Sequence, residues 1–409
     1  MNKASVIDLI RHSSRGISRA ELAETLQVSR STISNIVGHL LESGLVVERG
    51  TGTSRGGRRP IVLEINPDAG RVVGVDIGAS HLVVIVADLN GAKLAETEEA
   101  FAIEAGPEAG LRQVLKAVEA TLARAGCTLA QVQAIAVGVP GPVVASEGMV
   151  SAPPIMPGWD AFPIRAQLEA TWGKPTTLDN DADLGALGEW TFGAGQGAND
   201  LAYIKIGTGI GCGLLLGGQI YRGVLGTAGE IGHVTISDSG PPCTCGNYGC
   251  LEAMAGGRAI AQRAQLAVKA GQRTVLAHLN GHRELTARDV AVAAANDDPV
   301  SQQLLADAGR HIGSAVASLI NLLNPGLVVL GGGVTGAGPW LLDPLHQAVA
   351  ERTMRPSRLA TRLVLGQLGR HSVALGAVAS ALTRAFQPYA RTSPGFANEA
   401  TIPAASPFP

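Results

Sequence analysis

The chain has 409 residues, which is enough for two to four domains that each bury a core of their own. Its hydrophobic share of 46% and charged share of 16% are those of an ordinary globular protein, and an aromatic share of 3% argues against ligand sites built from stacked rings. The formal net charge of −2 argues against a polyelectrolyte partner for the chain as a whole. Through residue 70, however, nine Lys and Arg face seven Asp and Glu, and the basic excess concentrates in Arg49, Arg55, Arg58 and Arg59.

The N-terminus has no signal-peptide pattern, because Met1, Asn2 and Lys3 lead into a mixed polar helical pattern and not into an apolar stretch. No segment reaches the roughly eighteen uninterrupted apolar residues that a membrane span needs. The five cysteines are odd in number and three are clustered, which suits thiolates in a reducing compartment better than disulfides. We therefore expect a cytoplasmic protein without a membrane partner.

Residues 1–68 have the pattern of a winged helix-turn-helix. An apolar face at residues 6–10 predicts a first helix, and Ser18 and Glu21 have the spacing of a capping box that opens a second. Short apolar runs at residues 45–47 and 61–63 predict two strands. The third helix should bury its apolar positions at helical spacing, and these are Ile33, Ile36, Val37, Leu40 and Leu41.

The exposed face of the third helix carries short polar side chains and one arginine, which suit base edges and phosphates. These are Arg30, Ser31, Thr32, Ser34 and Asn35. The Gly- and Arg-rich segment 50–60 predicts a flexible wing, whose arginines can enter a narrow A·T-rich minor groove. The wing candidates are Arg55, Arg58 and Arg59. Each part alone also fits a helical adaptor with a solvated loop, but the ordered set favours operator DNA as the partner.

From Arg71 onward, Gly- and Val-rich strands alternate with helices, and one strand-turn-strand pattern occurs twice. The first copy is at residues 72–87 and the second at residues 201–216, which predicts a duplicated α/β architecture of two lobes around a cleft. Two Gly-rich turns that face one cleft can offer backbone N–H groups to phosphates, although a single such turn is usually only a tight turn. A third turn at residues 331–333 either admits a nucleotide base or permits close helix packing.

A segment near the middle of the chain combines one histidine with three cysteines. His233, Cys243, Cys245 and Cys250 lie within about twenty residues and can close a tetrahedral zinc shell. The alternative is a set of free buried thiols beside a surface histidine. A separate candidate is Asp181, which either caps a helix or acts as a base that takes the proton of a sugar hydroxyl.

These features resemble the ROK family of repressors, open reading frames and sugar kinases, from the N-terminus to about residue 385. The segment Cys243-Thr-Cys245-Gly-Asn-Tyr-Gly-Cys250-Leu-Glu252, preceded by Glu230-Ile-Gly-His233, matches the family signature without a gap. The resemblance implies the two-lobed, actin-like sugar-kinase fold of the ribonuclease H-like class behind the winged helix-turn-helix. It also implies that His233, Cys243, Cys245 and Cys250 bind a structural Zn²⁺.

By the same resemblance, a sugar is held by Asn180, Asp181, Glu230, His233 and Glu252, and Asp181 is the catalytic base in the kinase members. His233 would then serve twice, with one ring nitrogen on the metal and the other toward the sugar. The nucleotide positions would be Asp76, Gly78, Ser80, Gly207, Thr208, Gly209 and Gly332. The first phosphate loop departs from the family pattern, because Ala79 replaces the second glycine, Ser80 a threonine and His81 a lysine.

The expected domains are a DNA-binding domain at residues 1–68, a first lobe at 69–198, a second lobe with the zinc motif at 199–386, and a disordered tail at 387–409. The last helix of the second lobe can pack back on the first. The leading hypothesis is a sugar-responsive transcriptional regulator, most simply a repressor of carbohydrate-metabolism genes, that works as a homodimer or homotetramer. The alternative is an ATP-dependent sugar kinase of the glucokinase type, with ATP and Mg²⁺ as cofactors, or a bifunctional protein.

Overall fold

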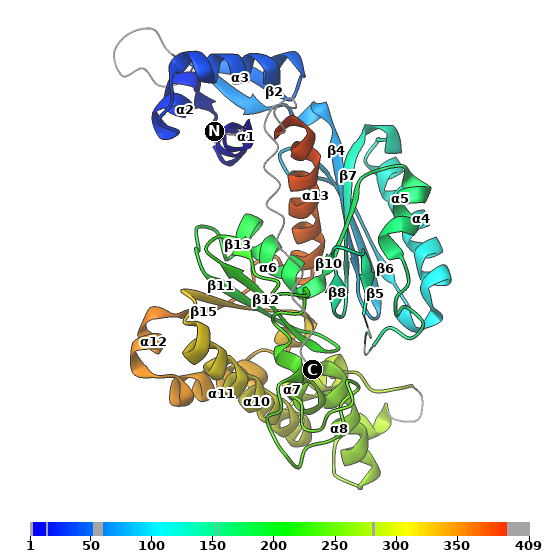
Figure 1. The fold of residues 1–409 in the computed structure, drawn as a ribbon. Helices are drawn as coiled ribbons and strands as arrows, with labels where there is room; N and C mark the ends of the chain where they lie inside the picture. The colour runs from blue at the N-terminus through cyan, green and yellow to red at the C-terminus, as the bar shows by residue number, and fades with distance from the viewer. Residues whose placement is uncertain are drawn as a thin grey trace, which may run out of the picture. The chain divides into compact units, whose positions relative to one another are not determined.

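The structure is a computed structural model with two compact units (Figure 1), and we describe each by itself. The first unit consists of residues 1–69 and 383–409, and the second of residues 70–382. The described residues are 3–13, 15–51, 60–151, 153, 155–279 and 283–390. No helix in this described part is long and apolar enough to cross a membrane.

In its described residues the first unit has helices α1, α2 and α3, the end of α13, and a sheet of order β1-β3-β2. Ser18 and Glu21 form the expected capping box at the start of α2, and Ser29 caps α3 by accepting a hydrogen bond from the N–H of Thr32. The core includes Val6, Ile7, Ile10, Leu22, Ile33, Val37 and Leu40, whereas Ile36 and Leu41 are only partly buried. The elements are α1 Lys3–His12, β1 Ile17–Ser18, α2 Arg19–Thr25, α3 Arg30–Glu42, β2 Val46–Thr51 and β3 Ile61–Ile65.

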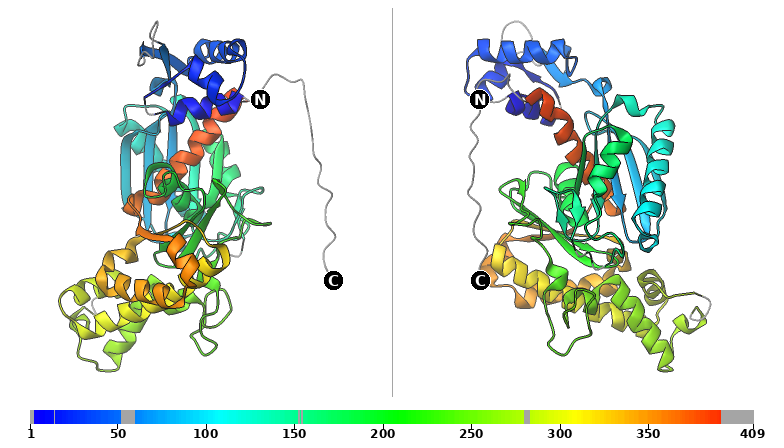
Figure 2. Two further views of the ribbon diagram at one scale, coloured as in Figure 1. Left: turned by 90° about the vertical axis from the view of Figure 1, so that its left-hand side faces the viewer. Right: turned by 45° about the vertical axis from the view of Figure 1, so that its right-hand side comes forward.

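The second unit begins with a five-stranded sheet of order β10-β7-β4-β5-β6. Strands β4, β7 and β10 run parallel, and β5 and β6 continue the sheet as antiparallel neighbours. Helices α4 and α5 cover one face (Figures 1 and 2), and the core between them includes Trp159 and Val137. The elements are β4 Arg71–Ile77, β5 His81–Asp88, β6 Lys93–Ala100, α4 Pro107–Arg124, β7 Val132–Val139, β8 Val143–Val144, β9 Met149–Val150, α5 Ile164–Trp172 and β10 Thr176–Asn180.

A second five-stranded sheet repeats this topology, with order β13-β12-β11-β14-β15. Strands β11, β14 and β15 are parallel, and β12 and β13 are antiparallel to their neighbours, as in the first sheet. This repetition confirms the duplicated two-lobed α/β fold. The elements are α6 Asp181–Phe192, β11 Leu201–Ile206, β12 Ile210–Leu216, β13 Gln219–Ile220, α7 Leu251–Ala255, α8 Gly257–Lys269, α9 Ala287–Ala295, α10 Pro299–Leu323, β14 Leu327–Gly331, α11 Pro339–Arg352, α12 Arg355–Ala360, β15 Arg362–Leu365 and α13 Ser372–Ala390.

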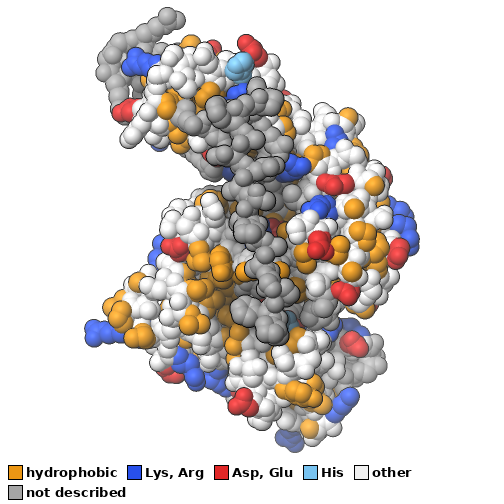
Figure 3. All heavy atoms as spheres, viewed as in Figure 1, with side chains coloured by type: hydrophobic (Ala, Val, Ile, Leu, Met, Phe, Trp, Pro, Cys, Tyr) orange, Lys and Arg blue, Asp and Glu red, His pale blue; other side chains and the backbone are white. Residues whose placement is uncertain are grey.

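The two faces of the second sheet have different partners, and this places the side chains of β11. Ala202, Ile204 and Ile206 face the core built by α7 to α11, whereas Leu201 and Tyr203 belong to a cluster with Ala186 of α6. Because side chains alternate along a strand, Lys205 shares the α6 face with Tyr203. On the side of the molecule drawn in Figure 3, acidic and basic side chains of the described residues are interspersed.

Helix α13 returns to the first sheet and packs on the face opposite α4 and α5 (Figures 1 and 2). A Cβ on Gly74 of β4 would lie 2.3 Å from the carbonyl oxygen of Ala374, so the helix and strand backbones are in close contact. The tail was expected to start at residue 387, but α13 continues to Ala390. The rest of the expected tail, residues 391–409, lies outside the described residues.

Helices α6 and α13 also meet through glycines. A Cβ on Gly376 would lie 1.7 Å from the carbonyl oxygen of Leu184, so Gly376→Ala must push the two backbones apart. We expect this substitution to lower the free energy of unfolding by about 1–3 kcal/mol, measured by urea unfolding. Gly336→Ala is the control, because its Cβ would meet nothing within 4 Å. Equal stability of the two variants would contradict this view of the crossing.

Candidate functional site

The His and Cys side chains of the signature segment come together as a four-residue cluster. The donor atoms of His233, Cys243, Cys245 and Cys250 all lie within 4.8 Å of one another. The Sγ of Cys243 is 3.6 Å from Nδ1 of His233, and the Sγ atoms of Cys245 and Cys250 are 3.7 Å apart. A tetrahedral shell with metal–sulfur bonds of about 2.3 Å and metal–nitrogen bonds of about 2.0 Å separates its donors by about 3.5–3.8 Å. The four residues therefore fit a structural metal ion.

The two ring nitrogens of His233 face different groups. Nδ1 is the atom beside Cys243, and Nε2 lies 3.9 Å from Oε2 of Glu230. A metal-binding imidazole whose other nitrogen faces a carboxylate has its tautomer fixed by that partner. The cluster thus braces one side of the neighbouring acidic site.

That acidic site, which we call the carboxylate site, gathers six side chains where the two lobes meet. Its members are Asp76, Asp179, Asp181, Asp183, Glu230 and Glu252. Burial raises the pKa of Glu230, His233 opposes the shift, and Asp181 and Glu252 add to it. Asp181 and Glu252, which are also expected to hold a sugar, therefore each lie within electrostatic range of Glu230.

The N-terminus of α6 organises the carboxylate site. Asn180 is the N-cap: its Oδ1 accepts the N–H of Ala182 at 2.8 Å, and its Nδ2 donates to the carbonyl oxygen of Gly141 at 2.9 Å. Most of the hydrogen-bonding capacity of Asn180 is therefore used by the backbone. Asp181 follows as the first helical residue, where the positive end of the helix dipole favours a negative charge.

Two cations from the second lobe pair with this acidic segment. Arg222 donates through Nε and Nη2 to the two oxygens of Asp179, and Lys205 donates through Nζ to Oδ2 of Asp181. Burial lowers the pKa of Lys205, but Asp181 and then Asp76 outweigh burial and leave it above its ordinary value. Lys205 is therefore a charged ammonium group at neutral pH.

Asp183 balances its charge by protonation. Burial, followed by the nearby charge of Asp179, raises its pKa to about 8, with Arg222 acting in the opposite direction. Its Oδ1 is buried and makes no hydrogen bond within the described part of the chain. At neutral pH Asp183 is thus a neutral carboxylic acid.

Glu252 connects the signature segment to the second glycine loop. Its Oε2 accepts the N–H of Ile210 at 2.9 Å, and a Cβ on Gly209 would lie 2.1 Å from the same oxygen. Glycine at 209 is therefore required for the carboxylate to reach the loop. The other loop residues bond the start of α8, because Gly207 and Thr208 accept the N–H groups of Gly257 and Arg258.

The first glycine loop places a histidine against its aspartate. Nε2 of His81 lies 3.2 Å from Oδ2 of Asp76, and Oδ1 of Asp76 is buried without a hydrogen-bonding partner among the described residues. Ser80 is exposed, and a Cβ on Gly78 would overlap the His81 ring. At the third turn, Gly332 has a φ of 87° and its Cβ would lie 2.4 Å from the carbonyl oxygen of Ile206. Close packing accounts for this glycine.

The candidate DNA-contacting residues of α3 share one exposed face. Arg30, Ser31, Thr32, Ser34 and Asn35 are all exposed. The hydroxyls of Ser31 and Thr32 lie 2.9 Å and 2.8 Å from Oγ of the capping Ser29. The side chains on this face with the fewest hydrogen bonds inside the protein are therefore Arg30, Ser34 and Asn35. The expected wing residues Arg55, Arg58 and Arg59 lie outside the described residues.

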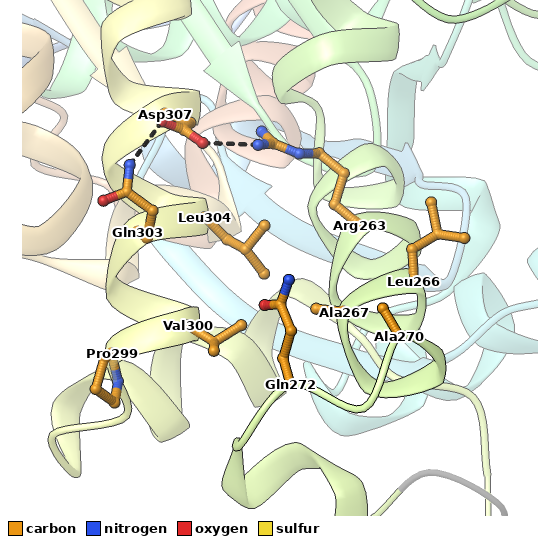
Figure 4. Close-up of a pocket in the computed structure, with 10 residues that line it drawn as sticks. All are labelled: Arg263, Leu266, Ala267, Ala270, Gln272, Pro299, Val300, Gln303, Leu304 and Asp307. Carbon is orange, nitrogen blue, oxygen red and sulfur yellow. Dashed lines mark hydrogen bonds and ion pairs between the residues drawn. The ribbon is translucent and has the colours of Figure 1, made fainter.

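A further groove of about 610 Å³ lies between α8 and α10 (Figure 4). Its walls include Leu266, Val300 and Leu304, and an ion pair between Arg263 and Asp307 crosses one end at 2.7 Å. It shares no residue with the carboxylate site.

Sequence reasoning missed two members of the carboxylate site, Asp179 and Asp183. It also missed the two basic residues that pair with the site, Lys205 and Arg222. Lys205 had a visible signal, because it is the one charged residue in the apolar strand Leu201–Ile206. Arg222 and Asp183 had none that is readable without the fold.

Comparison with known proteins identifies the family of this chain. A model of the ROK family matches residues 72–384, and a model of the MarR family matches residues 2–59. The chain belongs to the ROK family. It carries in addition a MarR-type winged helix-turn-helix at its N-terminus.

Several relatives match over nearly the whole length of both chains. A putative xylose repressor of Caldicellulosiruptor sp. (strain Rt8B.4) is 31% identical over 90% of this chain and 92% of its own. The DNA-binding transcriptional dual regulator NagC of Escherichia coli (strain K12) is 30% identical over 93% and 91%. The crystal structure of a ROK family transcriptional regulator, a homologue of the E. coli MLC protein, superimposes with a TM-score of 0.79 at 27% identity, over 94% of this chain and 96% of that one.

Asp183 predicts a specific pH dependence of stability. Its folded pKa of about 8 lies above the unfolded value near 3.8, so between these limits the native state holds a proton that the unfolded chain releases. The stabilisation is complete below the unfolded pKa and is lost as the pH rises through the folded one. Asp183→Asn removes this loss. The free energy of unfolding of the variant, relative to that of the wild type, should therefore increase by about 1.4 kcal/mol per pH unit between pH 5 and 7.5. Urea unfolding across that range measures it, and parallel pH profiles would refute the assignment.

Proposed function

We propose that this ROK protein is a repressor of sugar-utilisation genes. Its affinity for operator DNA changes when a sugar binds in the carboxylate site. The observation that carries the proposal is the combination, in one chain, of a winged helix with an exposed polar recognition face and a ROK body with a metal-braced acidic site. Relatives named as a putative xylose repressor and as a DNA-binding transcriptional dual regulator match 90% and 93% of this chain, which is more than the residues 72–384 that the ROK family model covers.

The sugar would be held by carboxylate acceptors and by the Nε2–H donor of the His233 imidazole, which lie close together. Asp181, Glu230 and Glu252 accept sugar hydroxyls, and Nε2 of His233 lies on the Glu230 side of its ring. Asn180 keeps the N-terminus of α6 in position and has one amide hydrogen left for the ligand. Ionised acceptors in a partly buried site give strong hydrogen bonds to hydroxyl groups.

The metal in the His233, Cys243, Cys245 and Cys250 cluster would be a structural Zn²⁺. Three thiolates and one imidazole are the donor set of closed tetrahedral zinc sites, which leave no position open for catalysis. The role of the ion is to fix His233, and through it the Glu230 side of the sugar site.

Operator DNA would be read by α3 and the wing. Arg30, Ser34 and Asn35 are the least engaged residues of the recognition face, and Arg55, Arg58 and Arg59 supply positive charge from the wing. Two heads in a homodimer or homotetramer would contact two half-sites, and a sugar that binds one arrangement of the oligomer better than the other would shift DNA affinity.

The proposal predicts that the two activities can be separated by substitution. Asn35→Ala should weaken binding to an operator duplex, isolated by selection from random DNA, about tenfold or more without changing sugar affinity. Glu230→Gln should weaken sugar binding about tenfold or more and abolish the response while DNA binding persists. Gel shifts and calorimetry with glucose, xylose and N-acetylglucosamine, free and phosphorylated, measure both. Unchanged behaviour of both variants would reject the proposal.

Metal content provides a separate test. Cys245→Ser should lose bound zinc and lower the melting temperature by about 5 °C or more, because metal affinity is folding free energy. Cys127→Ser is the matched control, since Cys127 is a buried free cysteine outside the cluster. Elemental analysis and thermal unfolding give the readout, and equal zinc in both variants would exclude the ligand set.

A further inference from the structure

Lys205 stands in an unusual place for a lysine. It lies on β11, the central strand of the second sheet, and its side chain is 17% exposed. Its neighbours across the sheet are Gly211 on β12 and Gly331 on β14. A Cβ on Gly331 would lie 2.3 Å from the hydroxyl oxygen of Tyr203, and a Cβ on Gly211 would lie 3.1 Å from Cβ of Ala182 on α6. Lys205 therefore lies in a closely packed part of the sheet, where a charged side chain needs a partner.

The ammonium group of Lys205 forms an ion pair with Asp181. Its Nζ donates to Oδ2 of Asp181, and Asp76 adds a second favourable charge interaction. Asp76 in turn has His81 on its own Oδ2 at 3.2 Å. The two aspartates that face the glycine loops therefore each have a basic side chain beside them.

Phosphoryl transfer to a sugar places other demands on these groups. The sugar oxygen forms a bond to the γ-phosphorus, the bond from that phosphorus to the oxygen of ADP breaks, and the hydroxyl proton passes to a carboxylate base. The base must accept a proton at that moment, and divalent cations must balance the phosphate charge. An ammonium ion bonded to a carboxylate favours its ionised form, and a fixed positive charge repels a divalent cation from the same place.

We propose that Lys205 determines the specificity of this site for binding without transfer: its ammonium group occupies one carboxylate oxygen of Asp181, leaves the other oxygen as a hydrogen-bond acceptor, and so removes Asp181 from proton transfer. This inference rests on the proposed function and deepens it, because it makes the ligand a sugar that is read and released unchanged. Lys205 bonds one carboxylate oxygen of Asp181, and the described residues supply no other side-chain partner. The second oxygen is the acceptor for a sugar hydroxyl.

The same arrangement favours a neutral sugar as the ligand. The positive charge of Lys205 is balanced by Asp181 and Asp76, and that of Arg222 by Asp179. Glu230 and Glu252 add further acidic groups to the site. No uncompensated positive charge is therefore left in the described part of the carboxylate site for a phosphorylated sugar.

The test uses the full chain with Lys205→Met, which keeps the length of the side chain and removes the charge, and Lys205→Arg, which keeps the charge. Both are made in the wild type and in an Ala79→Gly background, so that the first glycine loop does not limit ATP binding. ADP release with Mg²⁺, ATP and each sugar of the panel is measured beside calorimetric sugar binding. Circular dichroism and binding to the selected operator duplex check that each variant folds.

The wild type and Lys205→Arg should bind sugar without sugar-dependent ADP release. Lys205→Met in the Ala79→Gly background should raise that release at least about tenfold, and a further Asp181→Asn should abolish it. If sugar binds but Lys205→Met does not increase ADP release, this inference is overturned and the proposed function is not. The same holds if the wild type releases ADP with sugar and Lys205→Met lowers that release. Tighter binding of phosphorylated sugars would overturn the assignment of a neutral ligand. Failure of the wild type to bind any sugar would reject the proposed function and this inference with it.

Discussion

The balance of charge around the N-terminus of α6 is the constraint on which the site depends. Six carboxylates gather there, and unpaired buried charges are costly. The structure balances them in four ways: Arg222 pairs with Asp179, Lys205 pairs with Asp181, Asp183 holds a proton, and the helix dipole of α6 favours its first turn. The carboxylate oxygens that these pairs leave without a partner can accept hydrogen bonds from hydroxyl groups.

The metal cluster and the second glycine loop keep this balance in place from the other lobe. His233 belongs to the cluster and faces Glu230. Glu252 lies two residues after the cluster residue Cys250 and accepts a hydrogen bond from the N–H of Ile210. One short segment thus fixes two of the carboxylates that are proposed to hold a sugar. Since zinc affinity in such clusters is coupled to folding, loss of the ion would disturb the positions of both carboxylates as well as the stability of the chain.

Several features of this structure could be predicted from short-range patterns in the sequence. The capping box of Ser18 and Glu21 and the Cys and His spacing of the signature segment need only short-range geometry, so the sequence predicted both. The partners of Asp181 could not be predicted in this way, because Lys205 is 24 residues away and reaches it only when β11 packs against α6. Asn180 caps α6, a role that sequence reasoning did not assign to it, and its expected role in sugar binding stays a prediction.

Helix α13 gives the chain a continuous element that belongs to both compact units. Near its start, Ser372 donates to Oε1 of Glu189, a fully buried carboxylate on α6 that also accepts the N–H groups of Gln367 and Leu368. Near its end, Phe386 is buried in the first unit with the Arg11 guanidinium 5.8 Å from its ring centre. A sugar changes DNA affinity only to the extent that it binds two arrangements unequally. The chain passes from one unit to the other at two places, between Ala69 and Gly70 and within α13, and any such difference must be transmitted between the units.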